Sequence, residues 1–486
     1  MAAIGATASS RAMGTHGRKT TRATGRTIWE NRPLGRCHSS GGTWTRSVDA
    51  RTLSMRDLLR TARRLGGAAP PDADTRPTKH VDDRPPVHGA PPPRPSPTTL
   101  LLPMHVAIDF SESEHQPTGV GTFTGGVVDA WCDRVAAGSL RLSLLTREEV
   151  ALPEAWRLAG VRCRASGRAA HPILWQRTRL PGLVREAAPD VFLGPAYALP
   201  PRLRVPAAVA LHDLSFERFP RAWSWRESWR RRLLARDAAR RARRIVTISH
   251  FSAAEVEALY GVPREKIVVV PLGVRPGLAH PAAAAGTGAD GPDDHDATPR
   301  LVALRRELGL RDDLPTVLHV GTLLARRNLP TLIAAAARVP GGAQLVVVGA
   351  HAGSSPLNLD ALALEAGLAG PLVHLPWIEA ARLADLYRLA DVYVSLSEYE
   401  GFGLPVLEAI ASGTPAVVLG VGASQELWSG HALTVSRLEP ESVAAAIAAV
   451  LEDPACGLQG RDALLERYTW KACGEAVLKA LRECLA

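Results

Sequence analysis

Short apolar runs alternate with amphipathic segments along most of the chain, and this alternation predicts its fold. In the first part, apolar runs typical of buried strands lie at residues 105–108, 190–193, 207–211, 245–248 and 267–270. Helical periodicity is clearest between them at residues 225–244 and 252–259. Ser252 and Glu255 have the spacing of a capping box at the start of the second helix. Strands that alternate with helices indicate a mainly parallel, doubly wound sheet.

A second series of the same kind follows a break in the pattern. Residues 276–299 are rich in Ala, Gly, Asp, Pro and His, which is typical of a flexible linker. The predicted strands after it lie at residues 316–320, 344–348, 372–375, 392–396 and 416–419. We therefore expect an α/β protein with two Rossmann-like domains, at residues 104–275 and 300–468, and a last helix within residues 469–486.

The first 103 residues form a leader of different composition. They contain 17 Lys and Arg against 7 Asp and Glu, whereas the remaining residues hold 41 basic and 41 acidic side chains. The net charge of +10 therefore belongs to the leader, and a nucleic-acid partner bound through it is only a remote alternative. The leader is rich in Arg, Ser, Thr and Pro and is predicted to be disordered.

The origin of the leader stays open between two readings. No apolar segment follows its basic residues, which argues against a secretory signal, but an organellar transit peptide fits an Arg-rich, acid-poor start. An upstream start codon is favoured, because Met104 directly precedes the first predicted strand. In that case residues 1–103 would not be part of the native protein.

Two further features of composition bear on the class of protein. No run approaches the ~18 apolar residues that a membrane span requires. The six cysteines are scattered, without the spacing of a metal site or a paired pattern, which favours a reducing compartment. We therefore expect a cytoplasmic protein.

Residues 391–420 carry the most informative chemical pattern. A predicted strand leads into a turn with Glu400, Gly401 and Gly403, and Pro405 then opens a helix over about residues 404–411. The glycines let backbone N–H groups approach an anion at the positive end of the helix, and Glu400 and Glu408 add two carboxylates. This pattern suits a ligand with hydroxyls and phosphate. On spacing alone, an ordinary strand-to-helix turn with a surface Glu fits as well.

The residues themselves, EGFGLPVLE from Glu400 to Glu408, resemble the Glu-x7-Glu signature of retaining glycosyltransferases of family 4, which have the GT-B fold. Further segments resemble that family in the expected order: residues 117–122, 212–213, 249–252, 271–274, 319–328 and 422–427. The resemblance covers the chain from Met104 onward. It implies two Rossmann-like domains that face a cleft, with the last helix crossing back to the first domain.

The resemblance also implies roles for individual residues. In HVGTLLARRN, residues 319–328, Gly321 and Thr322 border the donor, and Arg326 and Arg327 stabilise the charge of a leaving diphosphate. Arg327 stands where the family usually has Lys. Without the resemblance, both arginines fit solvated positions at a helix start.

The other implied site residues surround the same donor. Glu408 binds the nucleotide ribose, Glu400 contacts the sugar, and His212 orients the sugar. Gln425 replaces the proline that usually precedes the Glu at position 426. The remaining nucleotide-sugar-binding positions are Gly401, Phe402, Gly403, Gly273 and Glu426, and the loop with Gly119 and Gly121 lies against donor and acceptor. Taken alone, the His and the glycine loops fit structural roles equally.

These roles imply a metal-independent hexosyltransferase. No Asp-x-Asp motif stands at a strand end, so no metal or other cofactor is expected. The donor is a nucleotide diphosphate sugar, with a mild preference for GDP-mannose because residues 319–328 and 212–213 look like bacterial mannosyltransferases. The acceptor is a hydroxyl of a glycan, a lipid-linked sugar or a small molecule, as in polysaccharide biosynthesis. A nucleotide-sugar epimerase with the GT-B fold stays an alternative.

The Arg-rich predicted helix at residues 225–244 has more than one interpretation. Trp223, Trp225 and Trp229 accompany its many arginines. Such a helix can lie on an anionic membrane surface, bind a phosphorylated acceptor or be a solvated amphipathic helix. Peripheral contact with the inner face of a membrane is therefore a hypothesis.

Overall fold

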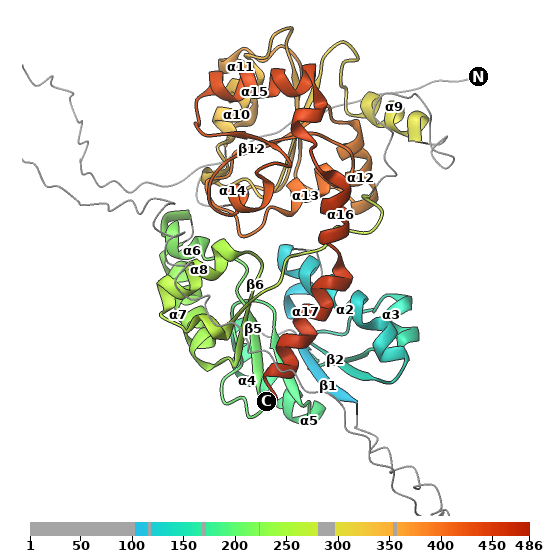
Figure 1. Cartoon of the computed structure of the whole chain (residues 1–486), viewed down its shortest axis with the longest axis vertical. Helices are drawn as coiled ribbons and strands as arrows, with labels where there is room; N and C mark the ends of the chain where they lie inside the picture. Colours follow the sequence, from blue (N-terminus) through green and yellow to red (C-terminus); the bar gives the residue numbers. More distant parts are fainter. Residues whose placement is uncertain (1–102, 115–117, 168–171, 223, 280–296, 353–356) are drawn as a thin grey trace, which may run out of the picture. The chain divides into compact units, whose positions relative to one another are not determined.

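The computed structural model describes residues 103–114, 118–167, 172–222, 224–279, 297–352 and 357–486 (Figure 1). Residues 1–102 of the predicted leader lie outside the described residues, as do Pro117, Trp223 and most of the predicted linker, so the predictions made for them stay predictions.

The first sheet is a seven-stranded parallel sheet in the order β3-β2-β1-β4-β5-β6-β7. Its strands have near-continuous apolar sequences because helices cover both faces of a parallel sheet. The strands are β1 Met104–Asp109, β2 Leu140–Thr146, β3 Arg162–Ala165, β4 Val191–Gly194, β5 Ala207–Ala210, β6 Arg244–Thr247 and β7 Ile267–Val269. The helices around them are α2 Gly119–Ala136, α3 Glu154–Ala159, α4 Pro172–Thr178, α5 Leu180–Ala187, α6 Ser215–Arg218, α7 Trp225–Arg241 and α8 His250–Tyr260, with short 3₁₀ turns at Ser111–Ser113, Pro220–Ala222 and Arg264–Lys266.

The second sheet has six parallel strands in the order β10-β9-β8-β11-β12-β13. The strands are β8 Thr316–Val320, β9 Gln344–Val348, β10 Leu372–Leu375, β11 Val392–Ser395, β12 Ala416–Leu419 and β13 Leu433–Val435. The helices are α9 Ala297–Glu307, α10 Leu329–Ala336, α11 Leu359–Ala366, α12 Ala380–Leu389, α13 Leu404–Ala411, α14 Gly422–Trp428, α15 Pro440–Glu452, α16 Arg461–Arg467 and α17 Trp470–Glu483, with 3₁₀ turns at Ala325–Arg327 and Pro454–Gly457.

The last helix, α17, packs against α2 of the first sheet's layer (Figure 1). Trp131 of α2 is fully buried, and its indole N–H donates to the carbonyl of Gly474 at 2.9 Å. Gly126 of α2 leaves room for Trp470, because a Cβ atom there would lie 2.2 Å from the indole ring. A salt bridge of 2.8 Å between Arg134 and Glu475 flanks this contact. The C-terminal segment therefore contributes to the core of the N-terminal domain.

Two local predictions are wrong: the residue that caps helix α8, and the two ends of the flexible linker. Helix α8 begins at His250 because Ser249, not Ser252, is its N-cap: the Ser249 hydroxyl accepts the backbone N–H of Ser252 at 3.0 Å. The first residues of the predicted flexible linker are docked, since Leu278 is 1% exposed within the core. Helix α9 begins at Ala297, which shortens the predicted linker at its other end.

Candidate functional site

A cavity of about 640 Å³ lies at the carboxyl ends of strands from both sheets. Its lining includes Asp109 at the end of β1, His212 after β5, Val320 at the end of β8 and Glu400 in the loop after β11. This edge is where doubly wound sheets bind ligands. Most of the predicted site residues line it together: Gly119, His212, Gly321, Thr322, Arg326, Arg327, Glu400, Gly401, Phe402, Gly403 and Glu408.

The most highly charged part of the lining is a cluster of two arginines and one carboxylate. The Oε1 atom of Glu400 lies 3.1 Å from a guanidinium nitrogen of Arg327 and 3.4 Å from one of Arg326. Burial raises the pKa of Glu400, but Arg327 and Arg326 outweigh burial and hold it below its ordinary value. The cluster therefore carries a net charge of +1, which suits an anionic group in the cavity.

The backbone around the cluster explains how the arginines reach Glu400. Gly321 has φ of 146°, and a Cβ atom there would lie 2.4 Å from the guanidinium of Arg327, so this position needs glycine. The carbonyl of Arg326 accepts the backbone N–H of Glu398 at 2.9 Å. Asn328 adopts φ of 54° and its amide donates to the carbonyl of Leu396 at 3.0 Å. The loop after β8 is thus tied to the loop after β11.

Glu408 lies inside α13 and is 2% exposed. Its Oε2 atom accepts a hydrogen bond of 3.0 Å from the Tyr387 hydroxyl, and its Oε1 atom lies 3.0 Å from a guanidinium nitrogen of Arg275. Burial raises the pKa of Glu408, and Arg275 and Tyr387 partly offset this. The second carboxylate of the signature therefore faces the cavity with a cation beside it.

His212 is buried on the other wall and is held as a neutral imidazole. Its Nε2–H donates to the carbonyl of Pro195 at 2.9 Å, which leaves Nδ1 as an acceptor. Burial lowers its pKa. Gly401 approaches it closely, because a Cβ atom at Gly401 would lie 2.2 Å from the His212 carbonyl oxygen. A neutral acceptor here suits a hydroxyl-bearing ligand better than proton donation.

Three predicted site residues lie outside the cavity lining. The Thr118 hydroxyl accepts the Gly121 N–H at 3.1 Å at the start of α2. Gly273 packs against the start of α17, where a Cβ atom added to it would lie 2.2 Å from the backbone nitrogen of Trp470. Glu426 accepts the backbone N–H groups of His250 and Phe251 at 2.9 and 2.6 Å. Glu426 therefore caps helix α8 of the other domain, where its carboxylate complements the positive helix end.

The structure adds residues to which the sequence assigned no role. Asp109 is 4% exposed, lines the cavity and accepts hydrogen bonds from the backbone N–H and hydroxyl of Ser111 at 3.1 and 2.6 Å. Burial raises its pKa to about 6. Arg275 and Tyr387 join the site through Glu408. The position of Asp109 at a strand end was the one available signal, since ligands bind there.

Within the described part of the chain, no group of three or more His, Cys, Asp or Glu side chains could hold a metal ion. The prediction that no metal is needed remains a prediction. The cations that face the cavity in the structure are arginines.

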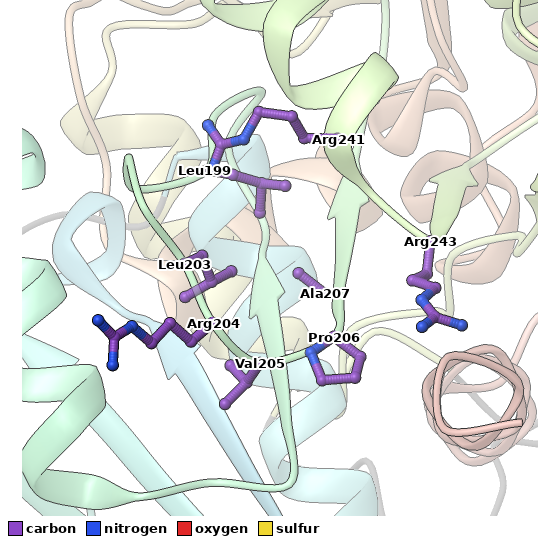
Figure 2. A pocket seen from close by; sticks show the side chains of 8 residues that line it. All are labelled: Leu199, Leu203, Arg204, Val205, Pro206, Ala207, Arg241 and Arg243. Atoms are coloured by element: carbon purple, nitrogen blue, oxygen red, sulfur yellow. The ribbon is translucent and has the colours of Figure 1, made fainter.

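A smaller open pocket of about 250 Å³ lies near the start of β5, away from the carboxyl edge of the sheet. Arg204, Arg241 and Arg243 line it, but Figure 2 shows their guanidinium groups pointing apart. Arg241 also pairs with Asp237 at 2.7 Å. The arginines do not converge on a shared point, so we assign no site to this pocket.

Helix α7 exposes an apolar stripe among its arginines. Trp225, Trp229 and Leu233 are 74%, 62% and 48% exposed and recur every fourth residue, so they share one face. Arg230 and Arg231 both pair with Glu227, at 2.5 and 2.7 Å, and also line the cavity. No helix in the described ranges is long and apolar enough to cross a membrane.

Comparison with known proteins identifies the type of fold. Residues 131–278 match the family described as Glycosyltransferase Family 4, and residues 303–467 match Glycosyl transferases group 1. The sucrose-phosphate synthase of Thermosynechococcus elongatus matches with a TM-score of 0.61 and 20% identity, over 78% of this chain and 98% of that one. HepE of Anabaena, solved with UDP and glucose, matches with a TM-score of 0.59 and 18% identity, over 78% and 99%. The predicted GT-B fold is confirmed.

The curated relatives are similar over part of their length. The D-inositol 3-phosphate glycosyltransferase of Xylanimonas cellulosilytica is 32% identical over 241 residues, which are 48% of this chain and 55% of that protein. The chain thus spans about half the length of the curated relatives it matches. Both halves of the chain resemble glycosyltransferases of family 4 type with the GT-B fold.

Proposed function

We propose that the chain is a retaining glycosyltransferase that moves a hexose from a nucleoside diphosphate sugar to a hydroxyl acceptor. The observation that carries this proposal is the cluster of Arg326, Arg327 and Glu400 beside Glu408 in one cavity. Two cations with one largely buried carboxylate fit a diphosphate next to a sugar, and the fully buried carboxylate of Glu408 fits ribose hydroxyls. The similar HepE structure contains UDP and glucose, which supports a nucleotide sugar as the donor.

In the proposed reaction, the bond between the sugar C1 and the diphosphate oxygen breaks while a bond from C1 to the acceptor oxygen forms on the same face. The proton of the acceptor hydroxyl moves to the leaving phosphate oxygen. Arg326 and Arg327 stabilise the negative charge that develops on the diphosphate, which is a role that fixed cations perform well in a cavity shielded from water. No metal ion is needed for this step, because the protein supplies the cations.

Glu400 and His212 orient the sugar in this proposal. Glu400 is held ionised by its two arginines and accepts hydrogen bonds from sugar hydroxyls. His212 is neutral and offers Nδ1 as an acceptor on the opposite wall. The resemblance of residues 319–328 favours mannose, whereas the similar solved structure contains glucose. Binding measurements with mannose- and glucose-linked donors distinguish the two hexoses.

The acceptor side is proposed to hold a hydroxyl-rich molecule. Asp109, Ser111 and Gln176 line that wall and offer hydrogen bonds to hydroxyls, and Arg230 and Arg231 add positive charge. Several curated relatives are named for an inositol phosphate, which combines both features. A lipid-linked acceptor is also compatible with this wall, since the exposed tryptophans of α7 suit the interface of an anionic bilayer.

A panel of UDP- and GDP-linked hexoses tests the donor assignment by thermal shift and by release of nucleoside diphosphate. We expect one nucleotide sugar to raise the melting temperature, because binding to the native state stabilises it. Replacement of Arg327 by Ala should abolish turnover, while replacement of Arg338, which pairs with Glu441 on the surface, should not. Nucleotide release that needs no acceptor and gives an isomerised or free sugar would instead indicate an epimerase or hydrolase.

Membrane contact is a separate part of the proposal. We expect the chain to sediment together with vesicles that contain anionic lipid. The double variant Trp225→Ala and Trp229→Ala should stay in the supernatant, because both side chains are exposed and apolar in the wild type. The change Leu364→Ala is a control, since Leu364 is 85% exposed on α11. Equal binding by all three proteins would contradict the membrane assignment of α7.

A further inference from the structure

The segment that leaves the first domain after β7 is fixed to the second domain on both sides of Arg275. The backbone N–H of Val274 donates to the carbonyl of Tyr468 at 2.9 Å. On the other side, the carbonyl of Gly277 accepts a hydrogen bond of 3.1 Å from Arg388, and Leu278 is 1% exposed. The backbone that carries Arg275 is therefore held in place by contacts that do not involve its own side chain.

From this fixed backbone, the side chain of Arg275 reaches the cavity. Its guanidinium lies 3.0 Å from Oε1 of Glu408, and the two side chains are 28% and 3% exposed. Oε1 of Glu408 accepts no hydrogen bond from the described residues, although it is buried. This oxygen thus has a cation at ion-pair distance and an unfilled capacity to accept hydrogen bonds.

The charged and titratable groups that face Glu408 come from three elements. Arg275 lies on the crossing segment, Tyr387 on α12 and Tyr393 on β11. Burial raises the pKa of both tyrosines, so they stay neutral through the ordinary pH range. Arg461 of α16 instead donates to the carbonyls at the far end of α13, at residues 410 and 411. Among these groups, Arg275 is the cation placed to oppose the effect of burial on Glu408.

We propose that Arg275 is a positioning residue of the donor site, which keeps Glu408 ionised so that its carboxylate accepts the ribose hydroxyls of the nucleotide. This inference rests on the proposed function. A carboxylate accepts hydrogen bonds at both oxygens, whereas a protonated carboxyl group gives up one of these positions to its own proton. The donor site is then incomplete in the second domain alone, because the crossing segment supplies the counter-ion.

The proposal predicts a specific dependence on pH when Arg275 is lost. Burial raises the pKa of Glu408, and without Arg275 this effect is offset only by the Tyr387 hydrogen bond. Without Arg275, Glu408 should take up a proton at a higher pH than it does in the wild type, and raising the pH further should remove that proton. Nucleotide affinity in Arg275→Gln should therefore be lowest at acid pH and recover as the pH rises. A residue that only supports the fold would lower affinity equally at each pH.

Calorimetric titration with UDP and with GDP, on the full chain at pH 6.5 and 8.5, tests this. We expect wild-type affinity to change little between the two pH values, and Arg275→Gln to lose about tenfold at pH 6.5 and less at pH 8.5. Arg275→Lys should behave as wild type, because it keeps the charge. Glu408→Gln should bind weakly at both pH values, and adding Arg275→Gln to it should change nothing further. Arg338→Ala is the matched control for loss of an arginine.

Each outcome separates this inference from the proposed function. A wild-type chain that binds neither nucleotide contradicts the proposed function and the inference with it. A wild-type chain that binds, together with an Arg275→Gln variant whose affinity is unchanged or falls equally at both pH values, contradicts the inference alone. If Arg275→Gln does not fold, Arg275→Met carries the same test, because it keeps the aliphatic stem without the charge.

Discussion

The buried carboxyl group of Asp109 allows a prediction about stability, because its burial costs free energy when it is ionised. Its pKa of about 6 in the folded protein exceeds the ordinary value of 3.8 by about two units. A group with a raised folded-state pKa contributes stability that is fully present below the unfolded pKa and is lost as pH rises through the folded pKa. Above pH 7 the ionised Asp109 therefore destabilises the fold by about 3 kcal/mol relative to its protonated form.

Replacement of Asp109 by Asn should remove this cost at high pH. The amide oxygen can still accept the two hydrogen bonds from Ser111, so Asn resembles the protonated acid. We expect Asp109→Asn to be more stable than wild type by about 3 kcal/mol at pH 8, which is roughly 6–12 °C in melting temperature for a domain of this size. The difference in unfolding free energy between the variant and the wild type should be smaller by about 1.4 kcal/mol at pH 5, where wild-type Asp109 is mostly protonated.

Thermal melting of the ligand-free chain at pH 5 and pH 8 measures both quantities. Asp312→Asn serves as the control, because its side chain is 95% exposed and should show no such dependence on pH. A variant less stable than wild type at pH 8, or a gap that is the same at both pH values, would show that burial does not raise the pKa of Asp109. The same substitution should impair transfer to an acceptor, since stability given up at a cavity wall is typical of a functional group.

Three further predictions concern the cavity and its surroundings. Glu400→Ala should leave UDP or GDP affinity nearly unchanged in calorimetry and lower turnover by about 1.5–3 kcal/mol in activation free energy, because Glu400 is assigned to the sugar; normal turnover would refute that assignment. Steady-state rates should be unchanged by EDTA, since Arg326 and Arg327 are proposed to stabilise the diphosphate; a loss restored by Mg²⁺ or Mn²⁺ would contradict this. Glu426→Gln should weaken the cap on α8, lower the free energy of unfolding by about 0.5–2 kcal/mol and so lower the melting temperature. An unchanged melting curve would show that the cap is not stabilising.

The sequence predicted the buried strands well because their environment makes them continuous apolar runs. The predicted bounds of β8, β9, β10 and β12 agree with the structure. Strand β3, with the sequence RCRA, was not predicted because it is a half-exposed edge strand without an apolar run. Strand β2 was also missed, because Arg141 and Ser143 interrupt its leucines. Ser143 is tolerated in the buried strand because its hydroxyl is hydrogen-bonded to His105. The position of a strand at the edge of a sheet and the hydrogen-bond partners of its side chains exist only in the folded sheet, so the local sequence pattern does not reveal them.

Site residues within one contiguous motif were predicted together, whereas those that depend on a contact between distant segments were not. The loop from Glu400 to Gly403 lines the cavity as expected, because a strand, a glycine turn and a helix start follow directly from the local sequence. Glu426 lies in a matching motif, but its neighbours are the N–H groups of α8 in the other domain. Arg275 is 133 positions from Glu408, and no local pattern joins them.

The distribution of buried charge argues that the cavity is where stability has been given up for function. Among the Asp, Glu, Lys and Arg side chains of the described residues, four are buried: Asp109, Glu114, Arg326 and Glu408. Glu114 pairs with Arg147 at 2.9 Å and does not line the cavity, whereas the other three line it. A buried charge is costly even when paired, so a core selected for stability alone would avoid it. Their concentration at one cavity that also gathers the motif residues is better explained by a ligand that needs them than by the fold.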